Sequence, residues 1–161
     1  MSHSTTYRDG IAPEEPGLRS GPVVIGVSNR FTADVQSLRD LGGNSMQKML
    51  EYLMERPEKG LLGYQQHGVF GVTVQYWRSF DHLEAFARDT DDPHLEVWRN
   101  FWKRVGKSGR TGIWHETFLV RAGEYEAIYG NMPAYGLGKA SKVVLVAESV
   151  GARNRLKASA S

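Results

Sequence analysis

The chain has no cysteine among its 161 residues. Disulfides, thiolate metal sites and cysteine nucleophiles are therefore excluded, and a reducing compartment is compatible with the sequence. No apolar run approaches the roughly 20 residues that a membrane-spanning helix needs. The first residues lack the basic-then-apolar order of a secretion signal. We therefore expect a cytoplasmic protein with no membrane partner.

A large excess of charge of one sign is also missing. The formal net charge is +2, and no stripe of Lys and Arg alternates with stacking aromatics, so we expect no nucleic-acid partner. Nucleotide-binding glycine loops, an HExxH metal motif and a serine nucleophile elbow are all missing. A small-molecule partner is the class of ligand that is left.

An ordinary hydrophobic content of 40% predicts one soluble domain with its own core. Residues 1–20 are rich in Ser, Thr, Pro, Gly and charge, which predicts a disordered N-terminal arm. The domain proper is expected at residues 21–148. The basic residues 149–161 are expected to form a frayed C-terminal tail.

Hydrophobic periodicity predicts an α+β fold. The expected elements are a strand at residues 22–28, a helix that starts at Asn44 or Ser45, strands at 61–67 and 71–78, a short helix capped by Ser79, a helix at 93–105 started by Asp92 and Pro93, a strand at 111–121, an extended run at 124–129 and a strand at 142–147. This order is the ferredoxin-like βαββαβ arrangement. Helices cover one face of such a sheet, so we expect two copies to pair their open faces into a dimeric α/β barrel.

Two repeating patterns assign faces to these elements. In the strand at residues 71–78, we expect the apolar face to carry Val72, Val74 and Tyr76. In the helix at residues 93–105, one face carries a stripe at helical spacing, made of His94, Val97, Trp98, Phe101, Trp102 and Val105.

His94 and His115 are the leading functional candidates. Residues 76–138 contain all four tryptophans and three of the five histidines. His94 lies on the predicted helix and His115 on the strand that follows it. Taken singly, each histidine also fits a capping or core-packing role. Together, among aromatics, they suggest a pocket with an imidazole on each side, which could ligate iron or move protons near neutral pH.

The run YWRSFDHLEAFAR…PHLEVW…GIWHETFLV…YEAIYGNMPAYGLG resembles a family of small bacterial and fungal proteins labelled monooxygenase-like, in the dimeric α/β-barrel superfamily. The resemblance covers roughly residues 20–145. It is specific in the Trp-His-Glu-Thr and Asn-Met-Pro stretches.

The same order of pieces more distantly resembles the C-terminal half of the haem-containing aldoxime dehydratases. This resemblance implies a b-type haem with His94 as the axial iron ligand and His115 as a distal acid and base. It also places Tyr129, Asn131 and Pro133 in an adjacent loop, where Met132 stands near a position that is polar in that family. The chain lacks the N-terminal half of those enzymes, which a homodimer would replace.

Three functional hypotheses follow. The first is a haem-dependent lyase or oxidoreductase that acts on a small, N–O-containing substrate. Its residues beyond the two histidines are Trp98 and Phe101 against the macrocycle, Glu116 as a candidate orienting group, Tyr129, Asn131 and Met132 in the loop, and Arg78, Arg99 and Arg121 as candidate propionate partners. The second is a cofactor-independent monooxygenase in which His115 orients an electron-rich aromatic with Trp77, Trp114 or Tyr129. The third is a non-catalytic ligand-binding barrel with structural histidines.

Overall fold

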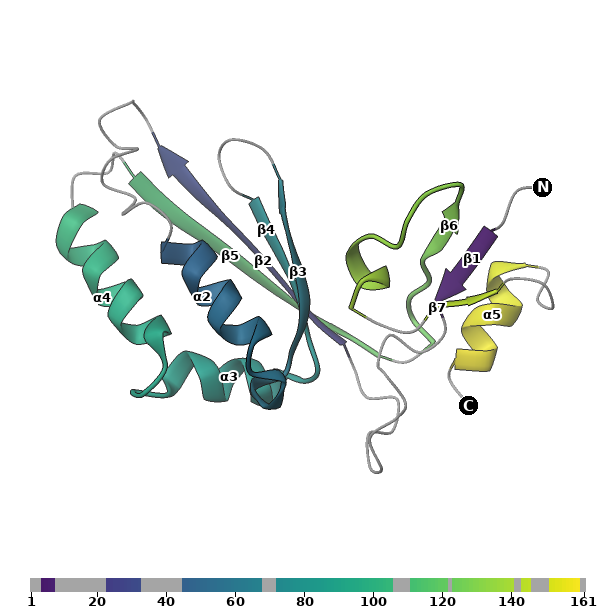
Figure 1. Ribbon diagram of the computed structural model, residues 1–161, viewed down its shortest axis with the longest axis horizontal. Coiled ribbons are helices and arrows are strands. Elements are labelled where there is room, and N and C mark those ends of the chain that lie inside the picture. The colour runs from purple at the N-terminus through teal and green to yellow at the C-terminus, as the bar shows by residue number, and fades with distance from the viewer. Residues whose placement is uncertain are drawn as a thin grey trace.

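A four-stranded antiparallel sheet with helices on one face forms the main body of the computed structural model (Figure 1). The structure describes residues 4–7, 23–32, 45–67, 72–105, 111–121, 123–140, 143–145 and 151–159. The strands, in spatial order, are β3 (Leu61–His67), β4 (Val72–Trp77), β2 (Val23–Thr32) and β5 (Thr111–Val120). The helices are α2 (Ser45–Met54), α3 (Phe80–Arg88) and α4 (Pro93–Val105).

This arrangement confirms the α+β class and the predicted strand, helix, strand, strand, helix, strand order. The central strand β2 pairs antiparallel with both β4 and β5, so that Val27 lies opposite Val74 on one side and Glu116 on the other. The pairing of two copies into a barrel stays a prediction. None of the helices in the described part of the chain has the length and apolar character needed to cross a bilayer.

The core lies between the sheet and α2. Its buried members are Met49, Leu50, Leu53, Leu61, Trp77 and Phe86. The apolar face of β4, with Val72, Val74 and Tyr76, is partly exposed, whereas Thr73 and Trp77 on the other face are each only 1% exposed. The apolar area of the Trp77 indole favours burial of this face more than its polar neighbours oppose it. The Trp77 Nε1–H donates to Gln75 Oε1 at 2.9 Å, so burial leaves no unsatisfied donor.

A second, three-stranded sheet corrects the expectation of a disordered arm and a frayed tail. In it β1 (Ser4–Tyr7) lies between β6 (Ile128–Gly130) and β7 (Val143–Leu145), and α5 (Ala152–Ser159) follows β7 (Figure 1). The rest of the predicted arm and tail lies outside the described residues. The composition of residues 1–20 did not indicate β1, because its partner strands are far away in the sequence. The threonines and tyrosine of β1 do favour strands.

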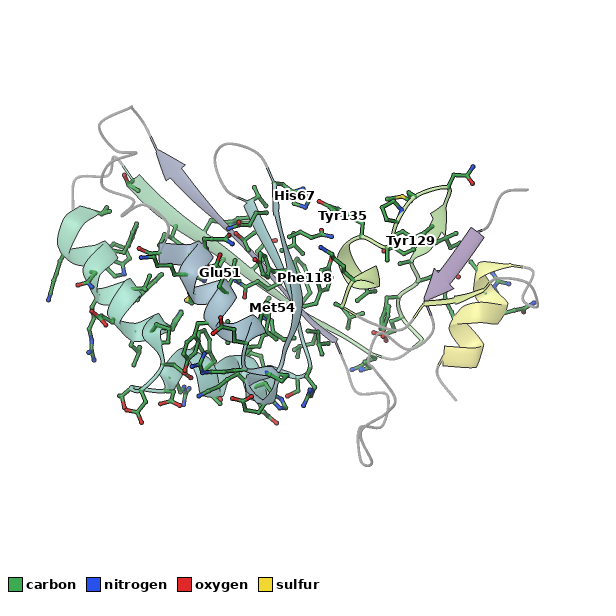
Figure 2. The ribbon with its side chains drawn as sticks, in the orientation of Figure 1. Glu51, Met54, His67, Phe118, Tyr129 and Tyr135 are labelled. Atoms are coloured by element: carbon green, nitrogen blue, oxygen red, sulfur yellow. The ribbon has the colours of Figure 1, made fainter. Side chains whose placement is uncertain are left out.

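Residues 128–140 cover the β3–β4 half of the open sheet face. The Tyr129 hydroxyl donates to the Tyr135 carbonyl and accepts the Gly138 N–H at 3.2 Å, which shapes the short 3₁₀ turn η2 (Gly136–Gly138). The Leu137 N–H donates to the Tyr76 hydroxyl on β4. The Tyr135 ring meets His67, at the end of β3, edge to face (Figure 2). We call residues 128–140 the covering segment.

Gly136 tests how closely the covering segment approaches the sheet. Its φ is +63°, and a Cβ there would lie 2.6 Å from Gln65 Nε2 and 3.1 Å from the Tyr76 hydroxyl oxygen. We expect Gly136→Ala to lower the free energy of unfolding by about 1–3 kcal/mol, measured by urea denaturation. Gly130→Ala, where a Cβ meets nothing within 4 Å, should change it by less than about 0.5 kcal/mol. Equal effects of the two variants would contradict the close approach.

Candidate active site

The start of α4 is fixed by a buried carboxylate. The side chain of Asp92 is 1% exposed and directly precedes Pro93, the first residue of α4. The Tyr52 hydroxyl donates to Asp92 Oδ1 at 2.5 Å, and Lys59 Nζ donates to Asp92 Oδ2 at 2.8 Å. Tyr52 lies on α2 and Lys59 on η1 (Pro57–Lys59). Both carboxylate oxygens are therefore satisfied, and α4 is tied to the two elements that precede β3.

His94 is held by the end of the preceding helix. The last carbonyls of a helix have no partner within it, and His94 Nδ1 lies 3.2 Å from the carbonyl oxygen of Ala87 in the last turn of α3. A carbonyl only accepts, so Nδ1 carries the proton and Nε2 keeps a free lone pair. Burial lowers the pKa of His94, against smaller opposing effects of the Ala87 carbonyl and the Asp92 charge. The imidazole is therefore neutral near neutral pH.

His115 approaches the same place from β5. The Trp98 ring lies 5.9 Å from the His115 ring and 6.4 Å from the His94 ring, with which it is stacked. His115 has an exposed surface, yet the protein atoms around its ring desolvate it enough to lower its pKa, and the nearby His94 lowers it further. Two neutral imidazoles, one from α4 and one from β5, thus lie near one indole.

Aromatic rings connect these histidines to the core and to the surface. Phe86 lies 5.6 Å from His94 and also packs on Trp77 in the core. On the other side, Trp98 packs against the buried Phe101 and against Trp102, which is 49% exposed. We call Phe86, His94, Trp98, Phe101, Trp102 and His115 the aromatic cluster. Its polar groups are the two imidazoles and the indole N–H groups of Trp98 and Trp102, and its ring faces are apolar.

The structure places Glu116 on the other side of β5, because neighbouring strand residues point to opposite faces. Glu116 is exposed. Arg78 follows β4, its N–H bonds to the Gly60 carbonyl, and its buried Nε has no hydrogen-bond partner among the described residues. Arg99 is exposed, and Arg121 pairs with Glu124 at 3.5 Å. A contact of these arginines with haem propionates stays a prediction.

The predicted loop residues belong to the covering segment rather than to the aromatic cluster. Tyr129 holds η2, Asn131 adopts a left-handed φ of 54°, and Met132 is 51% exposed. The covering segment packs against Gly63, Gln65 and Tyr76, on the sheet face away from the core. Of the predicted site residues, the structure brings together His94, Trp98, Phe101 and His115.

Sequence reasoning missed Tyr52 and Lys59, which position α4. Neither has a local signal, since both reach Asp92 from more than thirty residues away. Among the described residues, no group of three or more His, Cys, Asp or Glu side chains could hold a metal ion. A single neutral imidazole with a free Nε2 does fit a haem iron, for which the macrocycle supplies the other nitrogen donors.

Together the fold and the paired imidazoles define an α+β protein with a histidine-lined aromatic site. The chain belongs to the Monooxygenase af470-like family, whose model matches residues 23–137. It is 28% identical over 142 residues to the monooxygenase af470 of Aspergillus fumigatus. The matched region covers 82% of this chain and 50% of that protein. The chain thus spans about half the length of this curated relative.

Two solved structures share the fold. One is an aldoxime dehydratase in complex with butyraldoxime, with a TM-score of 0.63 and 18% identity over 86% of this chain and 40% of that one. The other is also an aldoxime dehydratase, with a TM-score of 0.56 and 16% identity over 86% of this chain and 46% of that one. At these identities the likeness establishes the fold.

The lowered pKa values predict an acid-sensitive fold. Both histidines have pKa values below 6.5, so the unfolded chain binds more protons as the pH falls past that value. Stability should be full above pH 6.5 and should fall as the pH drops toward the folded-state pKa values. Urea denaturation across this range measures the loss. Replacing both residues, as His94→Gln with His115→Gln, should flatten the profile, and an unchanged slope in this double variant would contradict the prediction.

Proposed function

We propose that this protein is a haem-binding enzyme whose active site lies between α4 and β5. His94 would hold the haem iron through Nε2, and His115 would serve as the acid and base at the same site. The observation that carries the proposal is the placement of two neutral imidazoles near one indole, Trp98, one of them with an unprotonated Nε2. The fold shared with the aldoxime dehydratases supports it.

His94 suits the role of ligand because its other nitrogen is engaged. The Ala87 carbonyl fixes the tautomer and makes the imidazole more basic toward a metal. Phe86 packs beside His94, and Phe101 packs beside Trp98. The Trp98 indole has to turn aside when a macrocycle enters. Haem, when bound, supplies an iron that coordinates an oxygen or nitrogen atom of a substrate.

His115 suits proton transfer because its pKa is held below the ordinary value. The neutral ring accepts a proton from the substrate, and the resulting imidazolium returns it readily to a departing oxygen. For a small substrate with an N–O bond, loss of one C–H proton and of the hydroxyl group then releases one water. We therefore propose an aldoxime or a related N–O compound as the substrate class.

A cofactor-independent monooxygenase is the second candidate. The Trp98 ring already lies near both imidazoles, as an aromatic substrate would, and the curated relative is named a monooxygenase. In this case an electron-rich aromatic substrate stacks in the aromatic cluster and His115 removes its proton, with molecular oxygen as the oxidant. Oxygen uptake by metal-free protein that is lost in His115→Ala and kept in His94→Ala would favour this candidate.

The haem proposal predicts a coloured protein. Protein from haem-supplemented cells should show a Soret band that His94→Ala abolishes and that the control His67→Ala retains. His115→Ala should keep the band but lower the turnover of an aldoxime at least about 100-fold, because it removes the proton-transfer group. A colourless protein after haem supply would overturn the proposal. A band that survives in His94→Ala would overturn the assignment of the ligand.

A further inference from the structure

β5 is an edge strand whose second half is exposed on both faces. All ten of its residues pair with β2 on one side, and no other described strand pairs with β5 on the other. Every residue from 114 to 119 is exposed, including Trp114 at 46%, Phe118 at 48% and Leu119 at 63%. A long apolar edge strand of this kind invites pairing with another strand.

The first half of the opposite edge strand is buried. In β3, Leu61 and Gly63 are buried, Leu61 belongs to the core beside α2, and Ala140 of the covering segment lies against Gly63. The covering segment also occupies the β3–β4 half of the open face. Pairing of two complete open faces, as expected from the sequence, would therefore collide with it. Among the described strands of the main sheet, β5 is the one that offers both its edge and its faces.

The sequence of β5 is complementary to itself in an antiparallel pair centred on Thr117. Thr117 then lies opposite Thr117, Glu116 opposite Phe118, and His115 opposite Leu119. No like charges face each other in this register, whereas a pair centred on Glu116 would oppose two carboxylates. Such self-complementarity is what a two-fold symmetric dimer requires. The curated relative, of which this chain covers 50%, has a further portion of similar length.

We propose that β5 pairs antiparallel with β5 of a second copy of this chain. The contact joins two four-stranded sheets into one and covers the exposed side chains of Trp114 and Phe118. It also brings Leu119 of the partner subunit beside His115, at the rim of the aromatic cluster. The dimer therefore shelters the site from water whether or not the site binds haem.

Cysteine cross-linking tests this contact, because the chain has no cysteine of its own. Opposite residues of an antiparallel pair have Cα atoms about 4.5–5.5 Å apart, within the range of about 4.4–6.8 Å that a disulfide needs. Mild oxidation should convert Thr117→Cys into a covalent dimer of twice 18.0 kDa. Gln66→Cys, at an exposed position of the opposite edge strand, is the matched control and should stay monomeric under denaturing, non-reducing conditions.

Sedimentation of charge variants tests the register. The parent should sediment as a dimer. Phe118→Glu should weaken association at least about tenfold, since it opposes Glu116, whereas Phe118→Lys should keep the dimer. Met54→Glu, at a residue that is 50% exposed on α2, should also keep it. A monomeric parent, equal cross-linking of the two cysteine variants, or equal loss in Phe118→Glu and Phe118→Lys would overturn the proposal. Circular dichroism checks that each variant is folded.

Discussion

The buried carboxylate of Asp92 is the constraint on which the functional part of this structure depends. A charge that is removed from water is tolerated when its hydrogen bonds are satisfied, and both oxygens of Asp92 are satisfied by Tyr52 and Lys59. Lys59 also pairs with Asp89, at the end of α3, at 3.3 Å. These contacts fix the corner between α3 and α4 against α2 and η1. Because His94 is two residues beyond Asp92, the fixed corner also positions His94.

From this corner the chemistry of the site follows by short steps. The Ala87 carbonyl, in the last turn of α3, accepts a hydrogen bond from the Nδ1–H of His94. This leaves Nε2 unprotonated, as the reactive nitrogen. The helical spacing of α4 sets Trp98 one turn after His94, and the strand β5 brings His115 near the same indole. Apolar neighbours then keep both imidazoles neutral. The α+β scaffold thereby brings His94, which is fixed by a hydrogen bond, and His115, which comes from β5, close to the same indole.

Local patterns predicted the elements that carry the site. The 3.6-residue spacing from His94 to Val105 gave α4 its bounds, and Ser79 was found as the cap of α3, where it accepts the His82 N–H at 3.3 Å. Distant partners left no such pattern. For that reason β1, the bonds of Asp92 and the docking of the covering segment escaped prediction. The pattern of β4 did not indicate which face is buried, because a single tryptophan outweighs the average polarity of its face.

The nitrogen NMR spectrum of the His94 ring tests the central claim most directly. The spectrum of the haem-free protein near neutral pH should show a neutral imidazole with the proton on Nδ1 and an unprotonated Nε2, because the Ala87 carbonyl holds the first and burial opposes a second proton. His94→Gln assigns the signals. A proton on Nε2, or a doubly protonated ring at that pH, would contradict the account, since Nε2 would then have no lone pair for iron.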